Sequence, residues 1–184
     1  MTRHFFGYGS LVNRRTHDYA PAHPARLDGW RRVWRGTGLR RFAFLSAEPA
    51  EGVSIAGLVA EVPGGDWAAL DRREAAYDRL PLAPATLAAP VREGVAIYVV
   101  PGAPEPVGEH PILLSYLDVV VQGFLAEFGA PGVAAFFATT EGWQAPVFDD
   151  RAAPLYPRAQ RLSPAERELV DAEIARHGLR RIVG

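Results

Sequence analysis

The stretch Gly7-Tyr8-Gly9-Ser10-Leu11 comes directly after the apolar run His4-Phe5-Phe6, and together they predict a first β-strand that ends in a tight turn. Glycine at position 9 can adopt a positive φ angle, and the backbone N–H groups of such a turn often converge on a carboxylate or a phosphate. The pattern matches neither the dinucleotide-binding fingerprint nor the nucleophile elbow of hydrolases. The sequence therefore leaves two interpretations of this stretch, an anion-binding turn and a plain chain reversal.

Most of the segments that follow this turn in the sequence are predicted strands, and the predicted helices lie between and after them. Strands are predicted at about 26–35, 42–45, 53–62, 86–91 and 95–100, the last two joined as a hairpin by residues 92–94. Helices are predicted from an N-cap at Asp66 to about residue 77 or 78, at about 112–128 and 133–139, and from a capping box at Ser163 and Glu166 to a stop at Gly178. Residues 101–111 and 142–161 are predicted as irregular. This order favours an α+β fold over regular βαβ winding.

The length, composition and net charge limit the classes of protein to which this chain can belong. The chain has 184 residues, of which 48% are hydrophobic, and no low-complexity linker divides it, so we predict a single domain over residues 1–184. The net charge of -1 provides no general attraction for nucleic acid or for an anionic membrane. The N-terminus does not have the pattern of a secretory signal, and the apolar run 112–128 is interrupted by polar residues, which predicts a buried helix. A cytoplasmic location is expected.

Two absent residue types exclude several kinds of chemistry. Without cysteine there is no disulfide, no thiolate nucleophile and no thiolate metal site. Without lysine there is no Schiff-base chemistry and no Walker-type phosphate loop. The five histidines lack the spacing of metal ligands, so we expect neither a metal nor a cofactor.

One carboxylate lies where an apolar residue is expected. On the helix predicted from Asp66, steps of three and seven place Trp67, Leu70 and Tyr77 on one stripe, and Glu74 falls on that stripe between the last two. Residues 72, 73 and 79 are predicted to point elsewhere. An inward glutamate has a raised pKa, which suits a residue that must take up and release a proton. A buried ion pair with an arginine, or a rotated helix that exposes Glu74, explains the pattern equally.

Two further stretches have alternative interpretations. Six arginines and two tryptophans alternate between residues 26 and 41, which is typical either of an RNA-binding platform or of a strand with indoles in the core and arginines in solvent. The low net charge favours the strand. The polar and aromatic segment 142–161 is predicted to form either a lid over a pocket or a packed loop.

Three motifs, taken together, resemble the γ-glutamylcyclotransferase superfamily, which includes ChaC-like enzymes, γ-glutamylamine cyclotransferases and AIG2-like proteins. They are Tyr8-Gly9-Ser10-Leu11 after the first strand, the segment 70–74 with Tyr77, and Ser115-Tyr116-Leu117 at the start of a long helix. The resemblance covers about the first 130 residues, so residues 142–184 are expected to be a C-terminal extension. It implies a small, closed or nearly closed mixed β-sheet, barrel-like and flanked by helices, with the substrate over the turn.

The resemblance also implies the chemistry. In such enzymes the α-amine of a small γ-glutamyl compound attacks its own γ-carbonyl and releases 5-oxoproline and an amine. Glu74 would then transfer the proton, and the backbone of Tyr8, Gly9, Ser10 and Leu11 would hold the α-carboxylate. Tyr116 would donate a hydrogen bond in the pocket. Tyr77 is expected either to line the pocket or to pack in the core.

Two departures from the family pattern leave the substrate open. Several members that act on γ-glutamyl amino acids have Asn where this chain has Leu11, and Ala75 stands where Gly often follows the catalytic glutamate. The proton transfer through Glu74 depends on neither residue. A binding protein of the same fold that does not turn over its ligand is the alternative function, and the oligomeric state is open.

Overall fold

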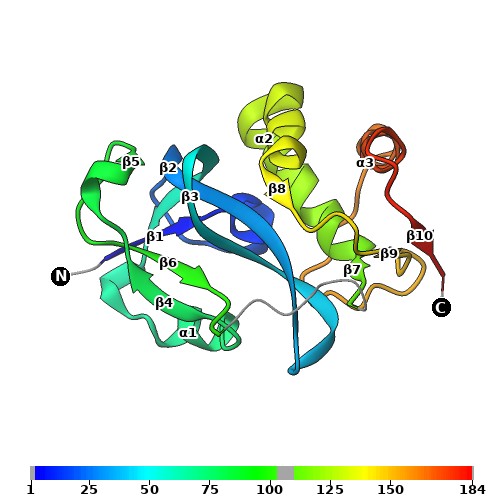
Figure 1. Ribbon diagram of the computed structural model, residues 1–184. Helices are drawn as coiled ribbons and strands as arrows, with labels where there is room; N and C mark the ends of the chain where they lie inside the picture. The colour runs from blue at the N-terminus through cyan, green and yellow to red at the C-terminus, as the bar shows by residue number, and fades with distance from the viewer. Residues whose placement is uncertain (1–2, 103–109, 184) are drawn as a thin grey trace.

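The computed structural model describes residues 3–102 and 110–183 (Figure 1). A seven-stranded sheet has the order β4-β6-β1-β3-β2-β5, with β8 also pairing with β2, and a three-stranded sheet has the order β10-β9-β7. The strands are β1 (His4–Gly7), β2 (Ala22–Thr37), β3 (Arg40–Glu61), β4 (Asp78–Pro81), β5 (Leu87–Ala88), β6 (Val95–Val99), β7 (Ile112–Leu113), β8 (Thr140–Glu141), β9 (Val147–Phe148) and β10 (Arg181–Ile182). The α-helices are α1 (Ala68–Arg73), α2 (Leu114–Ala138) and α3 (Pro164–Arg176).

The long hairpin of β2 and β3 forms the curved centre of the large sheet (Figure 1). Its pairing shifts register around Gly29, which has a φ of 76°. This bulge changes which alternate side chains face inward, so that Leu27 before it and Arg32 and Trp34 after it are all buried. Residues 42–45 and 53–62 were predicted as separate strands. They belong to one strand, because their antiparallel partner β2 continues alongside them.

Strand β1 lies between β3, to which it is antiparallel, and β6, to which it is parallel. The predicted hairpin between 86–91 and 95–100 is wrong, because β5 pairs with β2 while β6 lies between β1 and β4. Every residue of β6 is buried, as expected for a strand with neighbours on both sides. Pro90, which has no N–H to donate to a sheet, separates the two segments.

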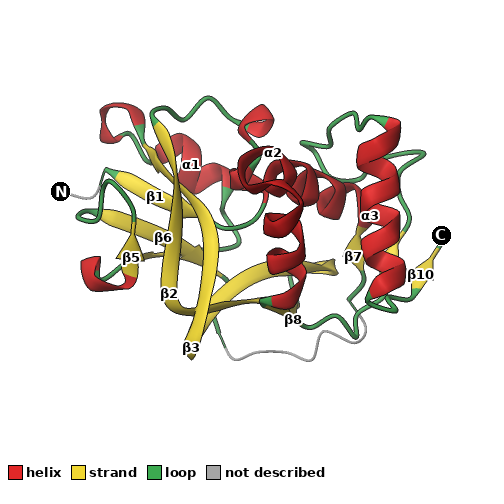
Figure 2. Ribbon diagram, turned by 90° about the horizontal axis from the view of Figure 1, so that it is seen from above, coloured by secondary structure: helices red, strands yellow, loops and turns green. Residues whose placement is uncertain are grey.

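Helix α2 packs across the curved hairpin and beside α3 (Figure 2). The helix is interrupted at Gly129, where φ is 66°, which confirms the prediction of two successive helices at about 112–128 and 133–139. The predicted start is two residues early, because residues 112 and 113 form β7. By length and apolar composition alone α2 could cross a membrane. In this structure its polar groups are buried and bonded inside the protein: Asp118 Oδ1 lies 2.7 Å from Arg151 Nη2, and Gln122 Oε1 accepts from the Asn13 side chain at 3.0 Å.

The C-terminal part adds α3 and the small parallel sheet. The predicted capping box is confirmed, because Ser163 accepts from the Glu166 amide at 3.2 Å and Glu166 accepts from the Ser163 amide at 2.6 Å. Gly178 follows the helix with a φ of 61°. The segment 142–161, predicted as irregular throughout, contains β9. The stretch 101–111, predicted as a loop, lies mostly outside the described residues.

The observed architecture confirms the predicted fold class. One curled, mixed sheet carries helices, and its core lies between the β2–β3 hairpin and α2. The turn that follows β1 lies beside the end of α1, where Arg73 Nη2 donates to Ser10 Oγ at 3.4 Å.

The arginine-rich strand differs from its prediction. Trp34 is buried on the core face, as expected, but Arg32 is only 1% exposed instead of lying in solvent. Two neighbours of Arg32 are partnered as well: Arg31 and Arg35 both contact Glu48, at 2.6 and 2.5 Å. A repeating strand pattern could not reveal this, because the bulge at Gly29 decides which residues face inward.

Candidate active site

Glu74 lies at the end of α1, one residue past its last helical position. The helix ends at Arg73 and not at about residue 77, because the chain turns there with a hydrogen bond from the Tyr77 amide to the Glu74 carbonyl at 2.8 Å. The predicted inward placement nevertheless holds. Leu70 is fully buried, and the Glu74 side chain is only 14% exposed.

Arg73 is the nearest charged partner of Glu74. Its side chain is 6% exposed, and its Nε lies 3.1 Å from Glu74 Oε1. Its Nη1 donates to the Thr16 carbonyl at 2.9 Å, and its Nη2 donates to Thr16 Oγ1 at 3.1 Å. The prediction that Arg73 points elsewhere is therefore wrong, because it assumed helical spacing where the helix ends. The buried ion pair considered as an alternative for Glu74 is present.

Glu74 also faces a cavity of about 380 Å³, which is within the usual range of roughly 300–1,000 Å³ for small-molecule sites. Its lining comes from Ser10, residues 40 and 42–45, residues 72–77, residues 113 and 116, and residues 155–158. A smaller recess of about 30 Å³ adjoins it, lined by residues 6–11 and 98. The two spaces share five residues: Ser10, Leu45, Glu74, Tyr77 and Tyr116. Glu74 is thus common to the cavity and to the recess over the glycine turn.

The turn after β1 contributes its backbone to the recess. The Tyr8 hydroxyl donates to the Tyr98 carbonyl at 2.6 Å, and the Leu11 side chain is buried, so both side chains serve packing. The amides of Gly9 and Leu11 donate to no backbone carbonyl in the described part of the chain. Two such amides in one turn, on either side of Ser10, can receive an anion.

Gly9 is required here for close approach and not for a positive φ, since its φ is -127°. A Cβ atom at position 9 would lie 2.7 Å from the Tyr116 hydroxyl oxygen, which is closer than such contacts permit. The Tyr116 hydroxyl therefore rests directly on the turn. A hydrogen bond from the Ser10 backbone also acts on this hydroxyl.

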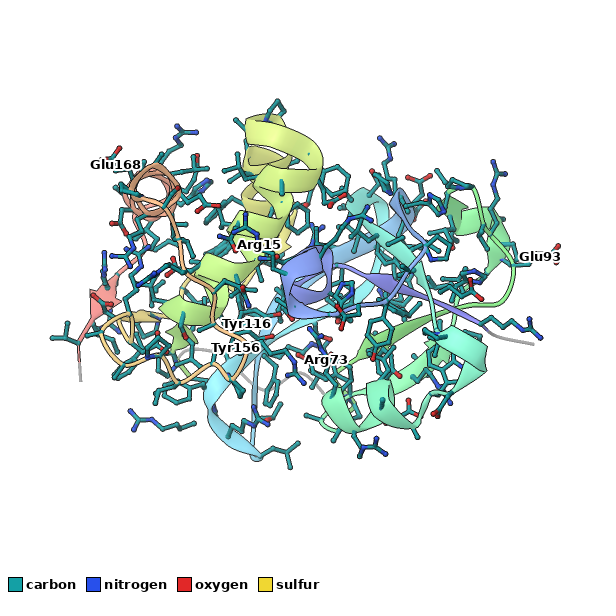
Figure 3. All side chains as sticks on the ribbon, turned by 180° about the vertical axis from the view of Figure 1, so that it is seen from behind. Arg15, Arg73, Glu93, Tyr116, Tyr156 and Glu168 are labelled. Carbon is teal, nitrogen blue, oxygen red and sulfur yellow. The ribbon has the colours of Figure 1, made fainter. Side chains whose placement is uncertain are left out.

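The C-terminal segment forms the opposite wall. Tyr156 packs edge-on against Tyr116, with ring centres 5.0 Å apart. Figure 3 shows Arg73, Tyr116 and Tyr156 gathered near the centre of the molecule. The segment is fixed to the start of α2, because Asp150 accepts from the Ser115 amide at 2.8 Å and from its hydroxyl at 2.5 Å. Residues 155–158 of the segment 142–161 line the cavity, and hydrogen bonds from the amides of Leu155 and Tyr156 hold them beside the start of α2.

The site favours neutral forms of its acidic groups. Burial raises the pKa of Glu74, and the charges of Arg73 and Arg158 and a hydrogen bond from Arg73 only partly oppose this. Burial also raises the pKa of Tyr116 well above its usual range, so its hydroxyl is protonated at neutral pH and able to donate. Tyr77, which lines both spaces, donates to the Leu45 carbonyl at 3.1 Å. Its hydroxyl is therefore engaged inside the wall.

The raised pKa of Glu74 predicts an effect on stability. A carboxyl group that ionises less readily when folded destabilises the fold increasingly as pH rises from the unfolded pKa, about 4.3, through the folded one. Glu74→Gln removes this penalty. We expect the variant to have a higher free energy of unfolding than the wild type at pH 8, with the difference vanishing near pH 4, in urea unfolding at both pH values. A variant less stable at pH 8 would show that the Arg73 pair outweighs burial.

All predicted site residues meet in these two spaces, and two others were missed. Arg73 could have been found from its position beside Glu74, had the helix end been recognised. Arg158 belongs to the segment 142–161, which was predicted to form either a lid over a pocket or a packed loop, but nothing in the sequence singled out this arginine. Among the described residues, no group of three histidine or acidic side chains is arranged to hold a metal.

A family model described as gamma-glutamyl cyclotransferase, AIG2-like, matches residues 5–116, more than half of the chain. The chain belongs to this family. The glycine turn, Glu74 and Tyr116 all lie inside the matched range, whereas residues 155–158 lie outside it. The predicted family is thereby confirmed, while the matched range says nothing about the substrate.

Solved structures agree with the fold of the gamma-glutamyl cyclotransferase family. One described as gamma-glutamyl cyclotransferase is 13% identical, with a TM-score of 0.54, over 92% of this chain and 98% of that chain. The human protein loc79017, described as uncharacterized, is also 13% identical, with a TM-score of 0.55 over the same shares. YkqA from Bacillus subtilis is 13% identical, with a TM-score of 0.57, over 76% of this chain and 56% of its own. No curated protein sequence matches the chain.

Proposed function

We propose that this protein cyclises the γ-glutamyl group of a small γ-glutamyl amine or peptide to 5-oxoproline and releases the amine. The observation that carries this proposal is the buried carboxylate of Glu74, which faces both the cavity and the recess over the glycine turn. A protein that only binds an anionic ligand gains nothing from a carboxylate at that point.

The glycine turn would orient the substrate. With the α-carboxylate on the amides of Gly9 and Leu11, the α-ammonium group lies in the recess that Glu74 also lines. Holding the amine and the γ-carbonyl together in one small space removes much of the entropic barrier to ring closure. The nucleophile belongs to the substrate, so the reaction needs neither cysteine nor lysine.

Glu74 would move one proton. Its carboxylate takes a proton from the α-ammonium, and the freed amine forms a C–N bond to the γ-carbon. When the tetrahedral intermediate collapses, the original amide C–N bond breaks and Glu74 returns the proton to the leaving nitrogen. The attacking nitrogen loses its second proton as it becomes the lactam N–H, and that proton passes to the released amine or to water. A raised pKa suits both steps, since the group must accept and donate near neutral pH. The protonated Tyr116 hydroxyl, above Gly9, is placed to donate to an oxygen of the bound substrate.

A direct test is to incubate the protein with γ-glutamyl dipeptides, γ-glutamyl-ε-lysine, a γ-glutamylamine and glutathione, and to measure 5-oxoproline by mass spectrometry. We expect release from at least one of them, with stoichiometric release of the amine. Saturable binding of these compounds without any 5-oxoproline would replace the proposal by the alternative of a binding protein.

A further inference from the structure

The large cavity is strongly cationic in a protein of net charge -1. Among the residues that the structure describes, its lining contains four arginines, at positions 40, 72, 73 and 158, and one carboxylate, that of Glu74. The Arg73 side chain is already paired with Glu74 and hydrogen-bonded to Thr16. Three arginines therefore face the cavity beyond what Glu74 neutralises, and in the described part of the chain none of the three has an acidic side chain within 4 Å.

Of these three arginines, Arg158 belongs to a segment whose backbone is held in place by hydrogen bonds. Its segment is tied to the start of α2 by a hydrogen bond from the Tyr156 amide to Ser115 Oγ at 3.3 Å, and by one from the Leu155 amide to Asp150 Oδ2 at 2.8 Å. Arg158 is half-buried, whereas Arg40 and Arg72 are exposed at the rim. Its charge also lowers the pKa of Glu74, so it lies within electrostatic reach of the proposed reacting centre.

From this arrangement we infer that Arg158 binds a carboxylate in the leaving group of the substrate, an inference that rests on the proposed function. The α-carboxylate of a γ-glutamyl compound is already accounted for by the glycine turn, so the remaining positive charge calls for a second anion. A γ-glutamyl amino acid or peptide provides one, and a simple γ-glutamylamine does not. Arginine suits this task because its planar group can bind a carboxylate through two parallel hydrogen bonds.

The sharpest test compares γ-glutamyl-alanine with γ-glutamyl-alaninamide, which differ only in the charge of the leaving group. A charge-assisted hydrogen bond predicts a kcat/KM about ten-fold or more higher for the acid. Arg158→Gln should remove most of this preference by lowering kcat/KM for the acid while leaving the amide nearly unchanged. Arg158→Lys should retain part of it, and Arg41→Gln, at an exposed arginine outside the cavity lining, should retain all of it.

The outcomes separate this inference from the function on which it rests. Equal kcat/KM for the acid and the amide in the wild type would overturn the inference and leave the cyclotransferase activity intact. An equal loss for both substrates in Arg158→Gln, with unchanged unfolding, would also overturn it. Absence of 5-oxoproline from every substrate would instead remove the proposed function, and the inference with it.

Discussion

Replacement of Glu74 by glutamine is expected to lower kcat for 5-oxoproline release by about 10²–10⁴-fold, the usual contribution of one positioned acid–base group. Glutamine fills nearly the same volume and keeps a hydrogen-bond acceptor for Arg73, but it cannot take the proton from the α-ammonium. The measurement is the initial rate of 5-oxoproline formation under saturating substrate.

A matched control variant tests whether the loss of kcat is specific to the carboxylate in the cavity. Asp78→Asn changes an exposed carboxylate four residues away, which does not line the cavity, and it should retain the wild-type rate. The two variants should unfold cooperatively, and Glu74→Gln should still bind the substrate. An undiminished rate in Glu74→Gln would refute the proton transfer proposed for this side chain.

Replacement of Arg32 by alanine is expected to lower the free energy of unfolding by about 2–5 kcal/mol, a large share of the roughly 5–15 kcal/mol that stabilises a typical domain. The Arg32 Nε donates to the Tyr8 carbonyl at 2.8 Å, and its Nη1 donates to Thr139 Oγ1 at 2.9 Å. Its guanidinium also lies 4.8 Å from the centre of the Phe124 ring. Truncation would leave a cavity and an unpaired carbonyl under the glycine turn. Urea unfolding followed by tryptophan fluorescence measures the loss.

Two further variants show which interactions account for the loss in free energy of unfolding expected for Arg32→Ala. Arg32→Met removes the same charge and hydrogen bonds but keeps most of the volume, so its loss should be smaller than that of Arg32→Ala, and the difference between the two reports the cavity. Arg31→Ala, on the neighbouring half-exposed residue, should change stability by about 1 kcal/mol or less. A loss below about 1 kcal/mol in Arg32→Ala would show that the surrounding core closes over the site.

Local signals predicted the parts of the fold that are determined locally. The capping box at Ser163 and Glu166 predicted the start of α3, and the gap predicted between helices 112–128 and 133–139 contains the break at Gly129. The pairing of β5 with β2 and the insertion of β6 between β1 and β4 were missed, because both depend on contacts between segments far apart in the chain. Because β5 and β6 are neighbours in the sequence, they were expected to pair as a hairpin. In the structure β5 pairs with β2, and β6 pairs with β1 and β4.

The candidate site was predicted from one anomaly and one resemblance. An acid on an apolar stripe pointed to Glu74, and the family motifs added the turn and Tyr116, which all meet in the same space. The rest could not be predicted from spacing. Arg73 turns inward because α1 ends there, and Arg158 enters the cavity because hydrogen bonds between Asp150 and Ser115 bring a distant segment back to α2.

The wall of the cavity comes from two stretches of the chain, one inside the range matched by the family and one beyond it. The turn, Glu74 and Tyr116 lie within residues 5–116, the range matched by the family, and the wall at 155–158 lies beyond it. Exchange of residues 155–158 replaces the part of the wall that carries Tyr156 and Arg158, while Glu74 and the glycine turn keep their own place in the chain. We therefore expect that grafting this one loop changes which compounds the cavity accepts, and that it also shifts the pKa of Glu74, since the charge of Arg158 lowers it.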